Sequence, residues 1–223
     1  MLLMPKWLPV TLLLLLGPIS LASCTEPPPE PTPPLPPIIS RTEWAAREPD
    51  HAAREERGFY DPISNPGGWR VYDQPLAAVL HTLVIHHSAL PVADGPLEIQ
   101  ALHMENKGYA DIGYHFLIDA TGQIFEGRPL DVRGAHTGGF NTGLIGVVLL
   151  GNFEERQPAE AQMDSLRTLT IYLRDSYQLT HLAGHRDFQP DETVCPGAFL
   201  APLLPPLAAE MGLIFGTGGY TRP

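Results

Sequence analysis

The apolar positions of this chain form runs that predict strands in its middle part. Residues 79–85 and 144–150 are almost continuously apolar, as strands that are buried on both faces are. Residues 113–119 and 123–128 also have strand patterns, and the turn residues between them predict a β-hairpin. We therefore expect a sheet to be built from this part of the chain.

Helical periodicity separates and follows these strands. Asp94 as N-cap and Pro96 at the first helical position predict a helix that ends at Gly108. Its expected apolar face is formed by Leu97, Ala101 and Met104. Pro158 opens a longer predicted helix, whose expected buried side is Met163, Leu166, Leu169, Leu173 and Tyr177. A last helix is predicted over residues 196–211, where it is interrupted by Pro202, Pro205 and Pro206.

Strands and helices that are mixed along one stretch of chain predict an α/β fold class, with one central sheet covered by helices. We place this single domain at residues 38–211 and interpret residues 212–223 as a tail. Residues 45–78 are charged and then rich in Gly, Pro and Asn without a clear period, which predicts an insertion or a surface loop. Its aromatic residues either pin this loop down or offer a binding face: Tyr60, Trp69 and Tyr72.

The N-terminus has the layout of an export signal. Residues 1–23 contain Lys6, then a short apolar run, then small residues before Cys24. The segment Leu21-Ala22-Ser23-Cys24 resembles the lipobox of bacterial lipoproteins, in which the cysteine becomes the lipidated first residue of the mature chain. An ordinary signal peptide and an uncleaved anchor are the alternatives. Residues 24–37 are dominated by proline and predict an extended tether, so we expect an exported protein held at a membrane through a lipid on Cys24.

Charge and cysteine usage narrow the class of protein further. The formal net charge of −11 over 223 residues, without a basic stripe, argues against nucleic acid as a partner. The two cysteines have separate contexts, Cys24 after the signal-like segment and Cys195 in a polar loop. The sequence therefore predicts no disulfide framework.

The loop from Gly184 to Gly197 carries the strongest sign of metal chemistry. It contains His185 and Cys195, and neutral imidazole and thiolate are ligands that zinc prefers. A third candidate follows the apolar run 79–85, where His86 and His87 end the predicted strand. Adjacent side chains on a strand point to opposite faces, so only one of them should face the metal, and the pattern alone does not choose. Two histidines and one cysteine would leave a fourth position open, which is the catalytic zinc pattern.

Four motifs in order carry a resemblance to a known family. They are Ile85-His86-His87-Ser88, Asp111-Ile112-Gly113-Tyr114-His115-Phe116, Gly134-Ala135-His136, and Gly184-His185-Arg186-Asp187 through Cys195-Pro196-Gly197. From about Ile39 to Met211 the chain resembles the zinc-dependent N-acetylmuramoyl-L-alanine amidases of the second type, a family that includes the peptidoglycan recognition proteins. The resemblance implies a central mixed β-sheet flanked by helices, with a Zn²⁺ at the floor of a groove.

The resemblance also implies roles for single residues. It makes His86, His185 and Cys195 the zinc ligands, and it places His136 and Asn141 in the polar loop that contacts the muramyl end of the substrate. The family's proton-handling group is a carboxylate on the central strand or a tyrosine. Here the strand position holds Val148, which leaves Tyr114. Two residues before the cysteine, phage members carry Lys whereas this chain has Thr193, whose hydroxyl could donate a hydrogen bond but no charge. The remaining histidines are expected to be surface or satisfied core residues: His51, His81, His103 and His181.

The resemblance predicts hydrolysis of the amide between N-acetylmuramic acid and L-alanine of the stem peptide in peptidoglycan, by a monomer. Two alternatives remain. The first is a binding module of the same fold that recognises peptidoglycan without cutting it, and the second is a hydrolase that uses this metal site on another substrate.

Overall fold

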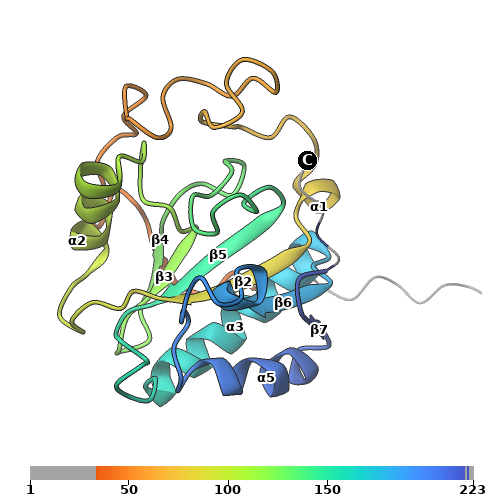
Figure 1. The fold of residues 1–223 in the computed structure, drawn as a ribbon. Coiled ribbons are helices and arrows are strands. Elements are labelled where there is room, and N and C mark those ends of the chain that lie inside the picture. The colour runs from red at the N-terminus through yellow and green to blue at the C-terminus, as the bar shows by residue number, and fades with distance from the viewer. Residues whose placement is uncertain (1–33, 219, 221–223) are drawn as a thin grey trace, which may run out of the picture. The chain divides into compact units, whose positions relative to one another are not determined.

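The fold is built on a seven-stranded mixed β-sheet. In the computed structural model, which describes residues 34–218 and 220, the strands lie in the order β1-β4-β3-β5-β2-β6-β7. Their bounds are β1 Ile38–Ile39, β2 Thr82–His87, β3 Phe116–Ile118, β4 Ile124–Glu126, β5 Leu144–Leu149, β6 His181–Gly184 and β7 Ile214–Phe215. The β3–β4 hairpin is antiparallel and the other pairs are parallel. The predicted single α/β domain with a mixed sheet is confirmed (Figure 1).

The centre of the sheet is β2, which lies between β5 and β6. Every residue of β2 and of β5 is buried, because helices and loops cover both faces of the sheet here. The predicted apolar runs are thus confirmed as strands. However, β2 begins at Thr82 rather than at residue 79, because residues Leu76–Val79 form the short helix α1 instead.

One face of the sheet packs on the long helix α3 (Glu160–Tyr177) and on α5 (Leu204–Glu210), which lie on the same side in Figure 1. The predicted buried stripe of α3 is confirmed at four positions, Met163, Leu166, Leu169 and Leu173, whereas Tyr177 is partly buried. Burying each of these leucines contributes about 2 kcal/mol of hydrophobic stabilisation. This face is the main apolar core of the domain.

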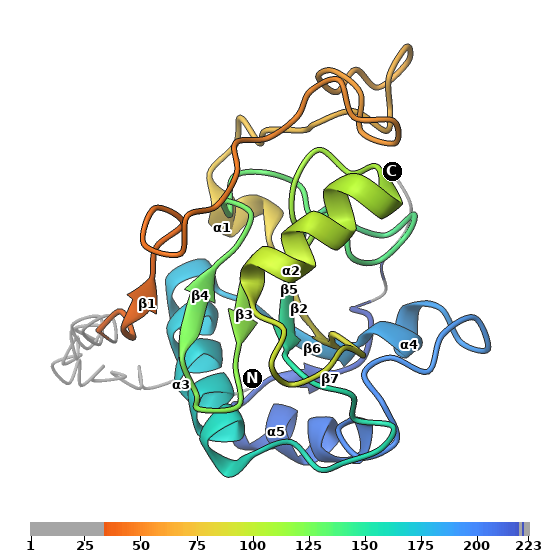
Figure 2. The same ribbon diagram turned by 90° about the vertical axis from the view of Figure 1, so that its left-hand side faces the viewer.

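The other face is covered by α2 (Pro96–Ala101), which continues as a π-helical segment η1 (Leu102–Lys107) and ends at the left-handed Gly108 (Figure 2). The predicted apolar face of this helix is wrong. Leu97 is 45% exposed, while Ile99, Gln100 and His103 are buried. The buried side chains are largely polar, so hydrophobic periodicity could not identify them. Gln100, for example, donates a hydrogen bond to the buried carboxylate of Asp111.

The C-terminal region differs from the prediction in two places, a shorter helix and an additional strand. The prolines confine the predicted helix over 196–211 to the 3₁₀ segment η2 (Ala201–Leu203) and α5. Beyond it, residues 214–215 of the expected tail form strand β7 beside β6.

Residues 45–75 form no helix or regular strand, whereas residues 76–78, the end of the predicted 45–78 insertion, belong to α1. Isolated bridges join Phe59 to Trp69 and Val71 to Val132. Trp69 and Tyr72 are buried, so these aromatic side chains pin the segment to the domain. It is drawn in orange to yellow in Figure 1 and passes over one end of the sheet.

The predicted signal, Cys24 and most of the proline tether lie outside the described residues. Among residues 34–218 and 220, we find no helix with the length and apolar character needed to cross a membrane.

Candidate metal centre

Three side chains of the metal-ligand type meet at one edge of the sheet. His86 lies near the end of β2, His185 follows the last residue of β6 as the first residue of α4 (His185–Phe188), and Cys195 lies in the loop beyond. Because β2 and β6 are adjacent and parallel, their carboxyl ends bring the two imidazoles to the same edge. One potential ligand atom from each of the three residues lies within 4.8 Å of the others.

The side chains of the adjacent residues His86 and His87 point to opposite faces of β2, so only one of them faces Cys195. The His86 Nδ1 atom lies 3.6 Å from the Cys195 Sγ atom. His87 points to the opposite face, where its Nδ1 atom accepts a hydrogen bond of 3.2 Å from the Phe153 backbone N–H. Strand alternation therefore places His86 in the cluster and His87 in the packing around Phe153.

Burial keeps all three groups uncharged when no cation is bound. Burial is the main cause that lowers the pKa of His86 well below its usual value, and the neighbouring His185 and His136 add to the effect. The pKa of His185 is also lowered, first by burial, although its bond to Gln189 opposes the shift. Burial raises the pKa of the Cys195 thiol to about 12. Two neutral imidazoles and a thiol thus face one another.

Each histidine of the cluster has a partner for its other ring nitrogen. The Nε2 atom of His185 lies 2.6 Å from the Gln189 Oε1 atom and donates a hydrogen bond to it, which leaves Nδ1 available. The Nε2 atom of His86 lies 3.0 Å from the His136 Nδ1 atom. Such outer partners fix the tautomer and the ring orientation of metal-binding histidines. The chain therefore orients both Nδ1 atoms toward a common centre.

Two glycines make room for the His136 ring. A Cβ atom added to Gly146, in the middle of β5, would lie 2.5 Å from the His136 ring, and one added to Gly134 would lie 2.4 Å from it. Any side chain at either position would displace the imidazole from His86. The absence of side chains at these two positions thus preserves the hydrogen bond between His136 and the predicted ligand His86.

The donor set fits zinc. Two imidazoles with outer hydrogen-bond partners and one buried cysteine match its preference for nitrogen and sulfur ligands, and three protein ligands leave a position for water or substrate. Burial alone disfavours the thiolate, and a bound divalent cation would offset this by stabilising the deprotonated sulfur.

Tyr114 lies beside the cluster, with its ring centroid 5.1 Å from that of His86. It precedes β3 and packs against the small apolar cluster around Ile112 and Val148. Its hydroxyl makes no hydrogen bond to any residue that the structure describes. Burial, with a smaller effect of Cys195, raises the pKa of the phenol, so it stays protonated and can donate a hydrogen bond.

The strand position beside His86 lacks a carboxylate. Val148 pairs with His86 in the β2–β5 register and is fully buried. The hydroxyl of Thr193 accepts a hydrogen bond of 3.2 Å from the Cys195 backbone N–H, so it shapes the turn before the cysteine. Tyr114 thus carries a protonated hydroxyl beside the cluster, and catalytic roles for Tyr114 and for Thr193 both stay predictions.

The two predicted substrate contacts occupy different places. The His136 imidazole points inward to His86 and is 8% exposed, whereas Asn141 lines a groove on the outer side of the same loop. The Asn141 Oδ1 atom accepts hydrogen bonds from the backbone N–H groups of His136 and Thr137 and so holds the loop. Substrate contact by either residue stays a prediction.

Sequence reasoning missed Gln189. Its signal was its place four residues after His185, a separation that brings side chains together on one helical turn. The inward position of His136 had no such local signal, because it depends on strands far apart in the sequence.

Comparisons with known proteins agree with this geometry. Residues 76–198 match a family described as N-acetylmuramoyl-L-alanine amidase. Peptidoglycan-recognition protein SD of Drosophila melanogaster is 32% identical over 172 residues, which cover 75% of this chain and 84% of that protein. The crystal structure of drosophila peptidoglycan recognition protein SD covers 75% of this chain and 92% of its own, with 30% identity and a TM-score of 0.60.

A bacterial enzyme is similar as well. The N-acetylmuramoyl-L-alanine amidase LysC from Clostridium intestinale is 32% identical, covers 64% of this chain and 93% of its own, and has a TM-score of 0.57. The similar proteins thus include some named for recognition and some named for hydrolysis.

Proposed function

Because the chain belongs to the N-acetylmuramoyl-L-alanine amidase family, we propose that it hydrolyses the amide bond between N-acetylmuramic acid and L-alanine in peptidoglycan, with zinc as cofactor. The observation that carries this proposal is the convergence of His86, His185 and Cys195 at one edge of the sheet, with the Tyr114 phenol beside them. A family member that only binds its ligand has no need of this complete ligand set.

The residues would divide the work as follows. His86, His185 and Cys195 would hold the zinc, which when bound supplies Lewis acidity toward the scissile carbonyl and the attacking water. Tyr114 would donate its phenolic proton in a hydrogen bond to the oxygen on which negative charge develops. Its raised pKa suits this donor role and does not suit a general base.

Recognition of peptidoglycan without hydrolysis is the second candidate. Two observations favour it: Val148 stands where a carboxylate could act, and Thr193 is engaged with the Cys195 backbone. Several similar proteins are also named for recognition. The complete ligand set favours hydrolysis over this candidate.

One experiment separates the candidates. Purified protein would be assayed for zinc by mass spectrometry and for release of stem peptides from purified sacculi. Hydrolysis predicts one zinc per chain and free stem peptides that begin with L-alanine. Binding to sacculi without release would instead support recognition, and zinc with hydrolysis of other amides alone would point to another substrate.

We further propose that the protein is exported and anchored through a lipid on Cys24, which the segment Leu21 to Cys24 and the following prolines support. An anchor outside the cytoplasm would place the domain next to intact wall. Cys24→Ala should shift the protein from the membrane fraction to the soluble or unprocessed fraction. Wild-type protein that is freely soluble and carries no acyl group would contradict the anchor.

A further inference from the structure

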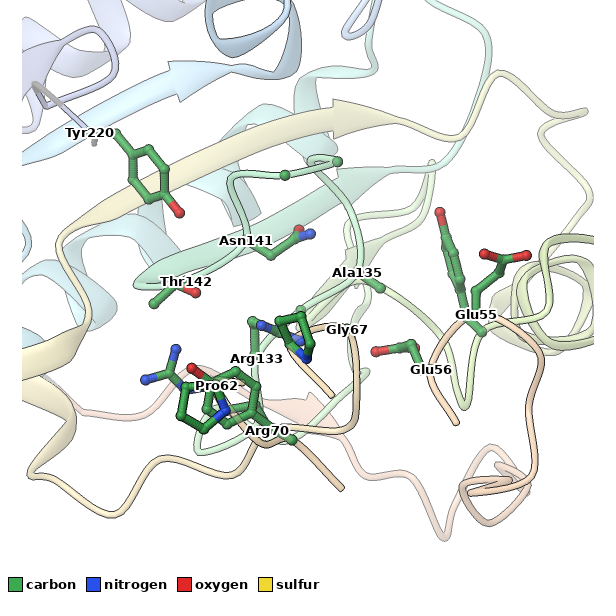
Figure 3. Close-up of a pocket in the computed structure, with 16 residues that line it drawn as sticks. Glu55, Glu56, Pro62, Gly67, Arg70, Arg133, Ala135, Asn141, Thr142 and Tyr220 are labelled. Atoms are coloured by element: carbon green, nitrogen blue, oxygen red, sulfur yellow. The ribbon is translucent and has the colours of Figure 1, made fainter. Parts of the chain in front are cut away.

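A groove of about 700 Å³ lies between the 45–75 segment and the glycine-rich loop 134–143. Figure 3 shows Arg70 and Arg133 on one side of it, with Asn141 and Thr142 on the other. Part of this groove comes from residues 55–70, which were predicted to be an insertion and take no part in the metal centre.

Two arginines share one aromatic ring in this groove. The guanidinium carbon of Arg70 lies 4.4 Å from the ring centroid of Tyr60, and that of Arg133 lies 5.3 Å from it. Arg133 also donates a hydrogen bond to the Gly68 carbonyl. Within the described part of the chain, neither guanidinium forms an ion pair, and Arg70 forms no side-chain hydrogen bond.

The acidic residues that line the groove are committed elsewhere. Glu56 binds the buried Arg128 through both of its carboxylate oxygens, at 2.8 Å each. Glu55 pairs with Arg54 at 2.7 Å. Two cations therefore lie close together without a carboxylate of their own, although the chain carries a net charge of −11.

The opposite side of the groove adds a further donor. The Asn141 Oδ1 atom is used by the loop, and its amide nitrogen forms no hydrogen bond with the residues that the structure describes. The same loop carries His136, which contacts the predicted ligand His86. A molecule that reached the metal centre could thus extend along this loop into the groove.

We propose that this groove is a carboxylate-binding site, in which Arg70 and Arg133 bind the terminal carboxylate of a stem peptide while Tyr60 holds the two guanidinium groups in place. A planar guanidinium matches the two oxygens of a carboxylate, and an arginine that has no internal ion pair loses none when it binds one. This inference rests on the proposed function, because it takes the stem peptide as the ligand.

The test uses a matched pair of probes. The first is muramyl-L-alanyl-D-isoglutaminyl-L-lysine with a free terminal carboxylate, and the second is its terminal carboxamide. Both are titrated calorimetrically into the full protein in EDTA, so that neither is hydrolysed. The acid should bind at least about tenfold more tightly than the amide, because a charge-assisted hydrogen bond to a desolvated carboxylate is worth that much.

Variants then assign the preference to the groove. Arg70→Gln and Arg133→Gln should each reduce the acid-over-amide preference to about twofold or less. Arg57→Gln is the matched control, since it removes an equal charge from an exposed position of the same segment outside the groove lining. It should keep the full preference.

The outcomes separate this site from the proposed hydrolysis. Equal binding of acid and amide by the wild type, or a preference that survives both groove substitutions, would overturn the site even if a variant were unstable. Release of stem peptides from sacculi by the same preparations reports on the proposed function independently. Release of stem peptides without the acid-over-amide preference would contradict the carboxylate site alone. The preference without release would support the carboxylate site in a protein that recognises peptidoglycan but does not cut it.

Discussion

The centre of the sheet and the 45–75 segment are ordered in different ways. Strands β2, β5 and β6 form a buried parallel ladder, and the predicted ligands follow from where these strands end. The 45–75 segment has no helix or regular strand and is held instead by isolated backbone hydrogen bonds and a few side chains. Its main anchor is Glu56, which binds Arg128 under the ring of Trp69, 4.6 Å from the guanidinium carbon.

Buried polar residues therefore have different roles in the two regions, proposed metal binding at the sheet edge and stabilisation in the segment. At the sheet edge, the buried histidines face a thiol, and the proposed metal would supply their remaining partner. In the 45–75 segment, the buried ion pair between Glu56 and Arg128 stabilises a chain that has no regular strand pairing. Arg128 also donates hydrogen bonds to the carbonyls of Ile112 and Arg133. Substitutions of the predicted ligands should therefore remove function and leave the fold intact, whereas breaking the Glu56–Arg128 pair should mainly lower stability.

The largest expected effect is at Cys195. Cys195→Ala removes the only thiol donor of the cluster, and two imidazoles alone hold zinc weakly. Zinc content measured by mass spectrometry should fall to a small fraction of one per chain, and amidase activity should drop roughly a hundredfold or more. The thermal midpoint of the metal-free protein should change little. Cys24→Ala, an identical substitution outside the domain, is the control and should keep its zinc. Full zinc stoichiometry in Cys195→Ala would show that the thiol is not a ligand.

Glu56→Gln should have the largest effect on stability. It leaves the Arg128 guanidinium buried without its counter-charge, at a cost of about 3 kcal/mol in the free energy of unfolding. Urea unfolding would measure this loss. Glu105→Gln breaks the exposed pair with Arg47 and should cost less than about 1 kcal/mol. Equal losses in the two variants would mean that the buried pair does not anchor the segment.

Tyr114→Phe tests the donor beside the metal centre. It keeps the ring in its apolar contacts and deletes only the hydroxyl, so folding, zinc content and fragment binding should be retained. One hydrogen bond to the developing oxyanion is worth about 2 to 4 kcal/mol, or roughly a hundred- to a thousandfold in turnover. Turnover within about threefold of the wild type would assign Tyr114 to packing alone.

The smallest effect concerns pH. His115 donates through Nε2 to the Val132 carbonyl and accepts through Nδ1 from the Gly146 N–H, so a second proton would break a hydrogen bond. Burial lowers its pKa to about 4, and that of His103 to about 3. Folded-state pKa values below the ordinary 6.5 mean that the unfolded chain binds more protons between about pH 6.5 and 4. The contribution of these two histidines to stability should therefore be constant above this window, and it should fall by on the order of 2 kcal/mol for each of them as the pH drops through it.

Urea unfolding at several pH values between 7.5 and 4.5 would measure this slope. His115→Asn should reduce the pH dependence of the free energy of unfolding by the contribution of one histidine, although the substitution lowers stability at every pH. A slope that His115→Asn does not change would show that His115 is protonated alike in both states.

Sequence pattern was sufficient where packing is apolar. The runs that became β2 and β5 and the stripe of α3 follow directly from hydrophobic periodicity. It failed on α2, because Gln100 and His103 are buried through hydrogen bonds that no apolar period records. The order of the 45–75 segment was also hidden, since Glu56 and Arg128 are 72 residues apart.

The candidate site shows the same division. His185 and Cys195 could be paired because they lie on one loop. The choice of His86 over His87 needed the family resemblance. The structure then showed that the His86 side chain faces Cys195 and the His87 side chain faces Phe153. The inward turn of His136 depends on the space left by Gly134 and Gly146 on two different elements. Such an arrangement cannot be read from one local stretch of sequence.

The order of strands in the sheet sets when the predicted metal centre can assemble. β2 is made early but lies between β5 and β6, and the atoms of His86 and Cys195 that meet are 109 residues apart. Closing a loop this long costs conformational entropy before the contact repays it. A chain that has emerged only as far as β5 carries His86 and Tyr114 but not the other two predicted ligands. Under the proposed function, such a partial chain would be unable to hold the metal, so hydrolysis would begin only once the chain is present as far as Cys195.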